Sequence, residues 1–247
     1  MNRKIILITG ATSGIGKHIA MRLLEAGAIV IINYGHNDEQ ASKTIKEFKA
    51  FSDNVLLIKA DISNELEIKK MFNIIEEKYG TIDVLINNAV FDRMSSLENY
   101  NYLDFQKILN TNILGKVFCI QQAIPLLKKS NYPNIINIAS RLGIKPMDDS
   151  AAYCCSAAAT IMLTKCAALE LGKYKIKVNT VSPSLTLTPL SKKSYTKEQM
   201  KSTARKSLKN RLCEPEDIYK TIKFLINDDS DFITGENINV SGGLLLI

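Results

Sequence analysis

Residues 9–16 read TGATSGIG, between the apolar run Lys4–Thr9 and a helical pattern over residues 14–27. The three glycines in this stretch let the backbone turn sharply and come close to a pyrophosphate. The helix that follows offers free amide donors and the positive end of its dipole to an anion. The spacing departs from the G-x-G-x-x-G fingerprint, so a glycine-rich turn without a ligand is the alternative. The position directly after a first strand favours a dinucleotide loop.

Short apolar runs alternate with longer amphipathic stretches from one end of the chain to the other. Most runs are rich in Ile, Val and Leu with little polar alternation, which indicates strands buried on both faces of a parallel sheet. The helical patterns cover residues 14–27, 37–51, 64–79, 100–130 with an interruption, 150–173 and 214–227. The apolar runs are Lys4–Thr9, Ala28–Asn33, Asn54–Lys59, Ile82–Asn87, Asn134–Ala139, Ile176–Ser182 and Asn237–Val240.

This alternation predicts an α/β fold. We expect a single-domain Rossmann fold over residues 1–247, in which a doubly wound, seven-stranded parallel sheet carries helices on both faces. Ligands of such sheets bind outside the carboxyl ends of the strands, at the switch in strand order. Functional residues are therefore expected where the strands end.

The bulk composition is that of one globular domain. Of 247 residues, 46% are hydrophobic and 23% charged, and no linker or repeat divides them. The net charge of +7 arises from lysines spread over helical faces, so we expect no nucleic-acid partner. The apolar runs are too short to span a bilayer and Met1 leads almost directly into a strand, so no membrane association and a cytoplasmic location are expected. The five cysteines lack metal-ligand spacing, so free thiols and no metal are expected.

The glycine-rich stretch resembles the cofactor loop of the short-chain dehydrogenases/reductases, and the resemblance continues in register along essentially the whole chain. Val90 and Ser184 stand where that family usually has glycine. The chain is in general similar to 3-oxoacyl-acyl-carrier-protein reductases, a subgroup close to the family average that does not identify the substrate. The further matching segments are Asp61-Ile62, Asn87-Asn88-Ala89, Asn112 to Gly115, Ser140, Tyr153, Val181 to Ser184, Thr188 to Leu190, Ile233 to Gly235 and Ser241 to Gly243.

The resemblance implies a hydride transfer between a nicotinamide and a carbonyl or alcohol. It implies that Tyr153 gives its phenolic proton to the carbonyl oxygen and that Ser140 orients this oxygen and stabilises its developing charge. It further implies that Asn112 holds a water of the proton relay. The implied cofactor-binding residues are Gly10, Thr12, Ser13, Gly14, Ile15, Gly16, Asn33, Tyr34, Asp61, Ile62, Asn88, Ala89, Tyr153, Pro183 and Thr188.

The end of the second strand bears on which nicotinamide cofactor is used. An acid there would hold the ribose hydroxyls and repel a 2′-phosphate, but the chain has no acid until Asp38. No arginine is present there to grip a phosphate, although His36, Asn33 and Lys17 could partly substitute. We expect NADP(H) to be favoured over NAD(H).

One part of the expected machinery is missing. A free phenol titrates near ~10, and the family lowers this pKa partly with a lysine four residues after the tyrosine. That position is Ala157. Lys165 would lie ~18 Å from Tyr153 along a helix axis. Arg141 and Arg93 are the nearest plausible cations in the sequence. Either the natural protein is an active reductase whose lysine was removed by design, or Ala157 is natural and the chain has drifted into cofactor binding without turnover, with a structural or regulatory role, or into different chemistry. In the first case the chain as given is expected to be a strongly impaired reductase.

Residues 184–211 resemble the family's substrate lid. Candidate pocket residues are Ser140, Tyr153, Arg93, Arg141, Leu185, Phe91, Leu142, Met147 and Leu190. The expected substrate is a carbonyl compound, either a small molecule or one carried by a carrier protein, and a homodimer or homotetramer is expected. The lid's basic cluster fits an acidic substrate or carrier as well as it fits a solvated surface. Its members are Lys192, Lys193, Lys197, Lys201, Arg205, Lys206, Lys209 and Arg211.

Overall fold

The apolar run before the glycine-rich loop forms a central strand, β1 (Ile5–Ile8), of one seven-stranded sheet. The computed structural model describes residues 3–246. All six strand pairs are parallel, in the order β3-β2-β1-β4-β5-β6-β7, so the strand order reverses between β1 and β4. The other strands are β2 (Ile29–Tyr34), β3 (Val55–Lys59), β4 (Val84–Asn87), β5 (Asn134–Ile138), β6 (Lys177–Pro183) and β7 (Asn237–Val240). The predicted fold class and all seven predicted strands are confirmed.

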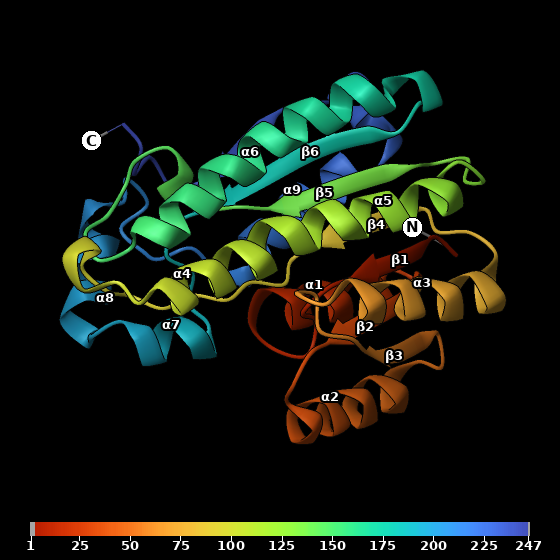
Figure 1. Ribbon diagram of the computed structural model, residues 1–247, viewed down its shortest axis with the longest axis horizontal. Helices are drawn as coiled ribbons and strands as arrows, with labels where there is room; N and C mark the ends of the chain where they lie inside the picture. The colour runs from red at the N-terminus through yellow and green to blue at the C-terminus, as the bar shows by residue number, and fades with distance from the viewer. Residues whose placement is uncertain (1–2, 247) are drawn as a thin grey trace.

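Helices cover both faces of the sheet (Figure 1). Helices α1 (Gly14–Glu25), α2 (Asp38–Phe51) and α9 (Pro215–Leu225) pack on one face, where buried side chains such as Ile19, Phe48 and Ile222 form a core. On the other face, α3 (Glu65–Tyr79), α5 (Gly115–Leu127) and α6 (Ala151–Leu171) bury Phe72, Ala123 and Leu171. Because a parallel strand is covered on both sides, its residues are apolar in succession.

The interruption predicted within residues 100–130 is a change of helical pitch. Helix α4 (Tyr102–Leu109) continues through a π-helical turn, η2 (Asn110–Leu114), directly into α5. The π turn contains Asn112, and such turns are frequent at functional sites because they re-aim one side chain. Short 3-10 turns follow other elements: η1 (Leu97–Asn99), η3 (Arg141–Gly143), η4 (Gly172–Tyr174) and η5 (Asp228–Ser230).

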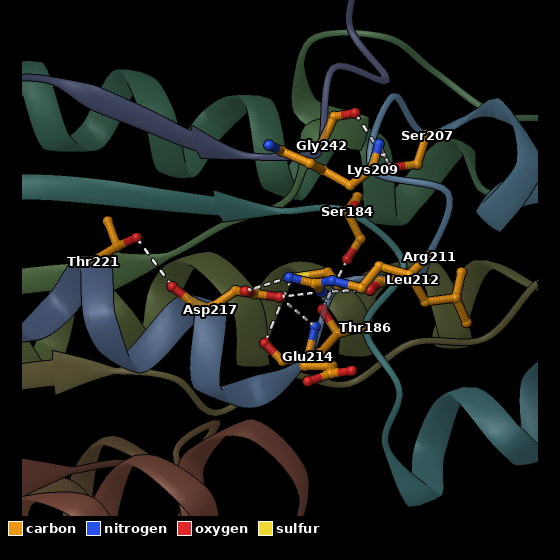
Figure 2. Close-up of polar contacts among 11 residues, drawn as sticks. Ser184, Thr186, Ser207, Lys209, Arg211, Leu212, Glu214, Asp217, Thr221 and Gly242 are labelled. Atoms are coloured by element: carbon orange, nitrogen blue, oxygen red, sulfur yellow. Dashed lines mark hydrogen bonds and ion pairs between the residues drawn. The ribbon is translucent and has the colours of Figure 1, made fainter.

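The predicted lid contains two short helices, α7 (Pro189–Ser194) and α8 (Lys197–Lys206), which begin with capping boxes at Thr188 and Thr196. They lie at the left end of Figure 1, where α6 begins. Figure 2 shows the return of the lid to the body of the protein: Arg211 lies against Asp217, with Nη1 and Nη2 at 2.6 and 2.8 Å from the two carboxylate oxygens. The lid is thus anchored at the start of α9.

Residues 151–174 form one continuous helical stretch, α6 followed by η4, which is long and apolar enough to cross a membrane by length and composition alone. In this structure α6 packs against β5 and β6 (Figure 1) and buries a line of small residues that includes Ala157, Thr160 and Thr164. This close packing places the first turn of α6, with Tyr153, at the carboxyl end of the sheet.

Candidate functional site

The glycine-rich loop connects β1 to α1 and leaves the start of that helix open. Ser13 occupies the N-cap of α1 without a side-chain cap, and no acidic residue lies in the first turn. Helices α2 and α3, by contrast, are capped by the side chains of Asn37 and Asn64 and have acidic residues in their first turns. An uncapped N-terminus keeps amide donors and a positive dipole end for an external anion. The residues present therefore fit the pyrophosphate of a dinucleotide.

The loop is tied to the end of β4 by backbone-directed hydrogen bonds. Asn88 Nδ2 donates to the carbonyl oxygens of Thr9 and Gly10 at 2.9 and 3.0 Å. Thr9 Oγ1 accepts from the amides of Asn88 and Ala89, both at 3.0 Å. A Cβ on Gly16 would stand 2.5 Å from Asn88 Nδ2 and 2.6 Å from the Gly10 oxygen, so only glycine fits there. The loop after β1 and the turn after β4 are thus held together at the switch point of the sheet.

The end of β2 differs from the expectation for the ribose site. Asn33 is fully buried, and its carboxamide donates to the Ala60 oxygen at 2.9 Å and accepts from the Gly10 amide at 3.3 Å. Asn33 therefore shapes the loop from beneath, and its carboxamide, which could partly have substituted for an arginine, is already hydrogen-bonded there. Lys17 forms an ion pair with Glu47 at 2.6 Å on the helix surface. His36 Nε2 lies 3.2 Å from an oxygen of Asp61, with the imidazole largely exposed.

A cavity of about 170 Å³ opens at the carboxyl ends of β4, β5 and β6. It brings together predicted catalytic, cofactor and pocket residues: Ile15, Asn88, Asn112, Ser140, Arg141, Leu142, Met147, Tyr153, Pro183, Leu185, Thr188 and Leu190. The other predicted cofactor-binding residues do not line this cavity; they lie in the glycine-rich loop, at the end of β2, after β3 and in the turn after β4. Among them, Ile62 is buried and packs against Gly115, so closely that a Cβ added to Gly115 would collide with Ile62.

The three predicted catalytic residues lie on three elements that converge at this cavity. Ser140 follows β5, and a hydrogen bond joins its side chain to Tyr153 in the first turn of α6. Asn112 in the π turn is buried, accepts from the Phe91 amide at 2.8 Å and donates to Ser156 Oγ at 3.1 Å. Ser156 Oγ in turn donates to the Tyr153 carbonyl oxygen at 2.8 Å. Asn112 thus fixes the first turn of α6 relative to the loop after β4.

The protein environment opposes ionisation of Tyr153. Burial raises the pKa of the phenol well above its ordinary value of 10.0, and the nearby carboxylate of Asp92 raises this pKa further. The hydrogen bond from Ser140 acts in the opposite direction but is the weaker effect. Burial also raises the pKa of Asp92, one of whose oxygens has no hydrogen-bond partner among residues 3–246. The surroundings of Tyr153 therefore favour the protonated phenol.

A cation missed by sequence reasoning lines this cavity. Lys116, in the first turn of α5, is 4% exposed, and burial lowers its pKa to about 7. The expectation that Arg141 and Arg93 are the nearest cations is thereby corrected: Lys116 and Arg141 both line the cavity. The available signal was a lysine inside the apolar stretch GKVFCI, four residues after Asn112. Asp92, Tyr195, Ser156 and Thr160 also line the cavity and were not predicted.

Arg93, predicted to contact substrate, lies elsewhere. Its guanidinium pairs with Asp104 at 3.0 Å on the start of α4, with 64% of the side chain exposed. It lines a separate surface depression together with Tyr100 and Leu103. Within the basic cluster of the lid, Arg211 already forms an ion pair with Asp217, so its charge is neutralised inside the protein.

Comparison with known proteins matches the chain to a family over nearly its whole length. Residues 10–245 match the family model described as Enoyl-(Acyl carrier protein) reductase. The chain is 35% identical over 243 residues to the (2S)-[(R)-hydroxy(phenyl)methyl]succinyl-CoA dehydrogenase subunit BbsD of Thauera aromatica, covering 98% of this chain and 97% of that protein. It is 34% identical over 245 residues to the 3-oxoacyl-[acyl-carrier-protein] reductase FabG of Staphylococcus aureus, covering 98% of each.

Solved structures give the same result. The 3-ketoacyl-(acyl-carrier-protein) reductase of Brucella melitensis, complexed with NADH, has a TM-score of 0.90 and 29% sequence identity over 98% of both chains. Levodione reductase has a TM-score of 0.92 over 98% of both chains; at 23% identity it supports the fold alone.

Proposed function

The chain belongs to the short-chain dehydrogenase/reductase family, and from that premise we propose that it reduces a carbonyl substrate with NADPH. The observation that carries the proposal is the convergence of Ser140, Tyr153 and Asn112 on one cavity at the switch point of the sheet. A bound nicotinamide supplies the hydride to the carbonyl carbon. Tyr153 gives its phenolic proton to the carbonyl oxygen, and Ser140 donates a hydrogen bond that orients this oxygen.

The preference for NADPH over NADH rests on the end of β2. The strand ends at Tyr34, and the first acid beyond it, Asp38, is held by the Tyr34 hydroxyl at 2.9 Å and by Lys59 at 2.8 Å. A carboxylate engaged in this way is not free to hold a ribose 2′-hydroxyl, which NAD-binding folds of this kind require. We expect kcat/KM to be at least several-fold higher with NADPH than with NADH.

The substrate class follows from the lining of the cavity. Leu142, Met147 and Leu185 give it an apolar wall, while Arg141 supplies one cation. Such a site fits an acyl or aromatic chain that carries a ketone and an anionic group. The names of BbsD and FabG identify thioester substrates for those proteins, so 3-oxoacyl thioesters are the first compounds to test.

The test follows NADPH oxidation with 3-oxoacyl thioesters and ketones. Tyr153→Phe keeps the ring and removes the proton donor, so kcat should fall by about 100-fold or more while the Kd for NADPH stays unchanged. Tyr132→Phe, at a surface ring stacked beneath Lys4, is the matched control and should keep full activity. A Tyr153→Phe protein as active as the parent would contradict the proposal.

A cofactor-binding protein with little turnover is the second candidate. The observation favouring it is the environment of Tyr153, whose pKa is raised by burial with no lysine at position 157. This candidate predicts NADPH binding, seen as enhanced nicotinamide fluorescence, with no oxidation by any thioester or ketone. Turnover lost in Tyr153→Phe would exclude it.

A further inference from the structure

Lys116 is a buried amine whose hydrogen-bond partners within residues 3–246 are neutral oxygens and not a carboxylate. Its Nζ donates to the Ile138 carbonyl oxygen at 2.8 Å and to Thr160 Oγ1 at 3.3 Å. Lysines are almost never fully buried unless paired, because removing the charge from water costs several kcal/mol. A leucine would fill this position in α5 without that cost, so packing alone does not explain why an amine is buried here.

The position of the amine is set by two parallel contacts between α5 and the π turn on one side and α6 on the other. Asn112 reaches Ser156, and one helical turn later Lys116 reaches Thr160. Ser156 and Thr160 are themselves one turn apart, and Thr160 Oγ1 donates to the Ser156 oxygen at 2.9 Å. Side chains three and four residues apart share a helix face, so Thr160, the partner of the amine, lies on the same face of α6 as Ala157 and Tyr153.

Ala157 leaves room for this arrangement. Its methyl group, Lys116 and Tyr153 all line the same cavity. An ammonium has three N–H donors, and within residues 3–246 two protein acceptors lie at hydrogen-bond distance from Nζ. The third N–H is available to the cavity, where a water or a ligand hydroxyl can accept it.

We propose that Lys116 is the positioning and proton-relay residue of this site, reaching the tyrosine's cavity from α5 rather than from α6. The inference rests on the proposed reduction. After Tyr153 has given its proton to the carbonyl oxygen, an N–H bond of the Lys116 ammonium breaks and the phenol O–H bond re-forms, with the proton passing through water in the cavity that both groups line. The neutral amine then takes a proton from solvent, and the hydride comes from NADPH.

The lowered pKa agrees with this role, because a proton carrier works best when its pKa is near the ambient pH. The other ionisable groups facing the cavity are Asp92 after β4, Arg141 after β5, Tyr153 on α6 and Tyr195 after α7, with Cys154 beside Tyr153. In the direction of reduction the ammonium is the active form. Turnover should therefore fall as the pH rises through about 7.

A four-protein cycle tests the assignment: the parent, Lys116→Met, Ala157→Lys and the double variant. Lys116→Met should lower kcat by about ten- to 100-fold, change KM by less than about threefold and remove the loss of turnover near pH 7. Ala157→Lys alone should raise kcat little, because the new ammonium group and that of Lys116 would compete for the same space. In the double variant, the lysine on α6 should raise kcat at least tenfold above that of Lys116→Met. Unchanged kcat and pH profile in Lys116→Met would overturn the proposal, whereas an inactive parent would contradict the proposed function instead.

A second measurement decides the assignment without turnover. With 13Cζ-labelled tyrosine, the Tyr153 resonance is identified by its loss in Tyr153→Phe and followed from pH 5.5 to 9. A relay predicts that this resonance shifts with a midpoint near 7 and that the shift disappears in Lys116→Met. A resonance that does not respond to pH in the parent, or a midpoint that persists in Lys116→Met, would overturn it.

Discussion

The phosphate loop and the reaction cavity lie at the same edge of the sheet, yet they are built differently. At the loop, the backbone carries the function: glycines allow the turn, and Asn88 holds carbonyl oxygens in place. At the cavity, side chains from the loop after β4, the π turn, α5, β5 and α6 converge. A site made by the backbone depends on consecutive residues. A site made by side chains depends on positions far apart in the sequence, so the same chemical group can be supplied from one helix in one protein and from another helix in a different protein.

The largest expected effect tests the site made by the backbone. Gly16→Ala places a methyl group 2.5 Å from Asn88 Nδ2 and 2.6 Å from the Gly10 oxygen, so the loop must open. We expect the Kd for NADPH to rise at least tenfold, measured by nicotinamide fluorescence. Gly172→Ala, where nothing lies within 4 Å of the added Cβ, is the matched control and should bind normally. Equal affinities in the two variants would show that the loop tolerates a side chain.

This contrast explains what the sequence could predict. The strands and the loop follow from apolar periodicity and glycine spacing, both of which are local. Tyr153 and Ser140 were found through resemblance, which transfers positions. Lys116 was missed because a lysine in an apolar helix gives no sign of which neighbour it reaches; its contacts with Ile138 and Thr160 exist only after α5 and α6 have packed. Arg93 was misplaced for the same reason, since its partner Asp104 lies on the following helix.

The next effect concerns the free energy of unfolding that is lost by burying the Lys116 amine. The pKa of Lys116 is about 7 in the folded protein against an ordinary 10.5. Between these values the unfolded chain holds a proton that the folded chain lacks, so stability rises with pH across that window. Below pH 7 the penalty is constant, on the order of 5 kcal/mol.

Lys116→Met removes this penalty but leaves the Ile138 oxygen without a donor, at a cost of about 1–3 kcal/mol. The variant should therefore have the larger free energy of unfolding at pH 6 and lose that advantage toward pH 10, in urea titrations at each pH. Lys165→Met, at an exposed position of α6, should leave the pH dependence unchanged. A Lys116→Met protein that is less stable at pH 6 would contradict the lowered pKa.

A smaller effect tests how the charged groups of the cavity change the pKa of Tyr153. The Asp92 carboxylate raises the pKa of Tyr153, so Asp92→Asn should lower that pKa and make the phenol a stronger acid. We expect kcat for reduction to rise by about two- to fivefold if proton transfer limits the rate. Asp148→Asn, a nearby exposed carboxylate, is the control. A lower kcat in Asp92→Asn with a raised KM would instead identify Asp92 as a substrate contact.

An effect of similar size, on KM alone, distinguishes two ways in which the basic lid could act. Arg211 anchors the lid to Asp217 through two hydrogen bonds, as Figure 2 shows, whereas Arg205 on α8 is exposed. If the lid acts through closure, Arg211→Gln should raise KM by about two- to fivefold and Arg205→Gln should not, with little change at higher salt. If the lid acts by attracting an acidic substrate, both variants should raise KM to a similar extent, and added salt should reduce the difference from the parent. Because Arg211 is already paired, we expect the first pattern: the side chains that hold this lid in place matter more than the charge it carries.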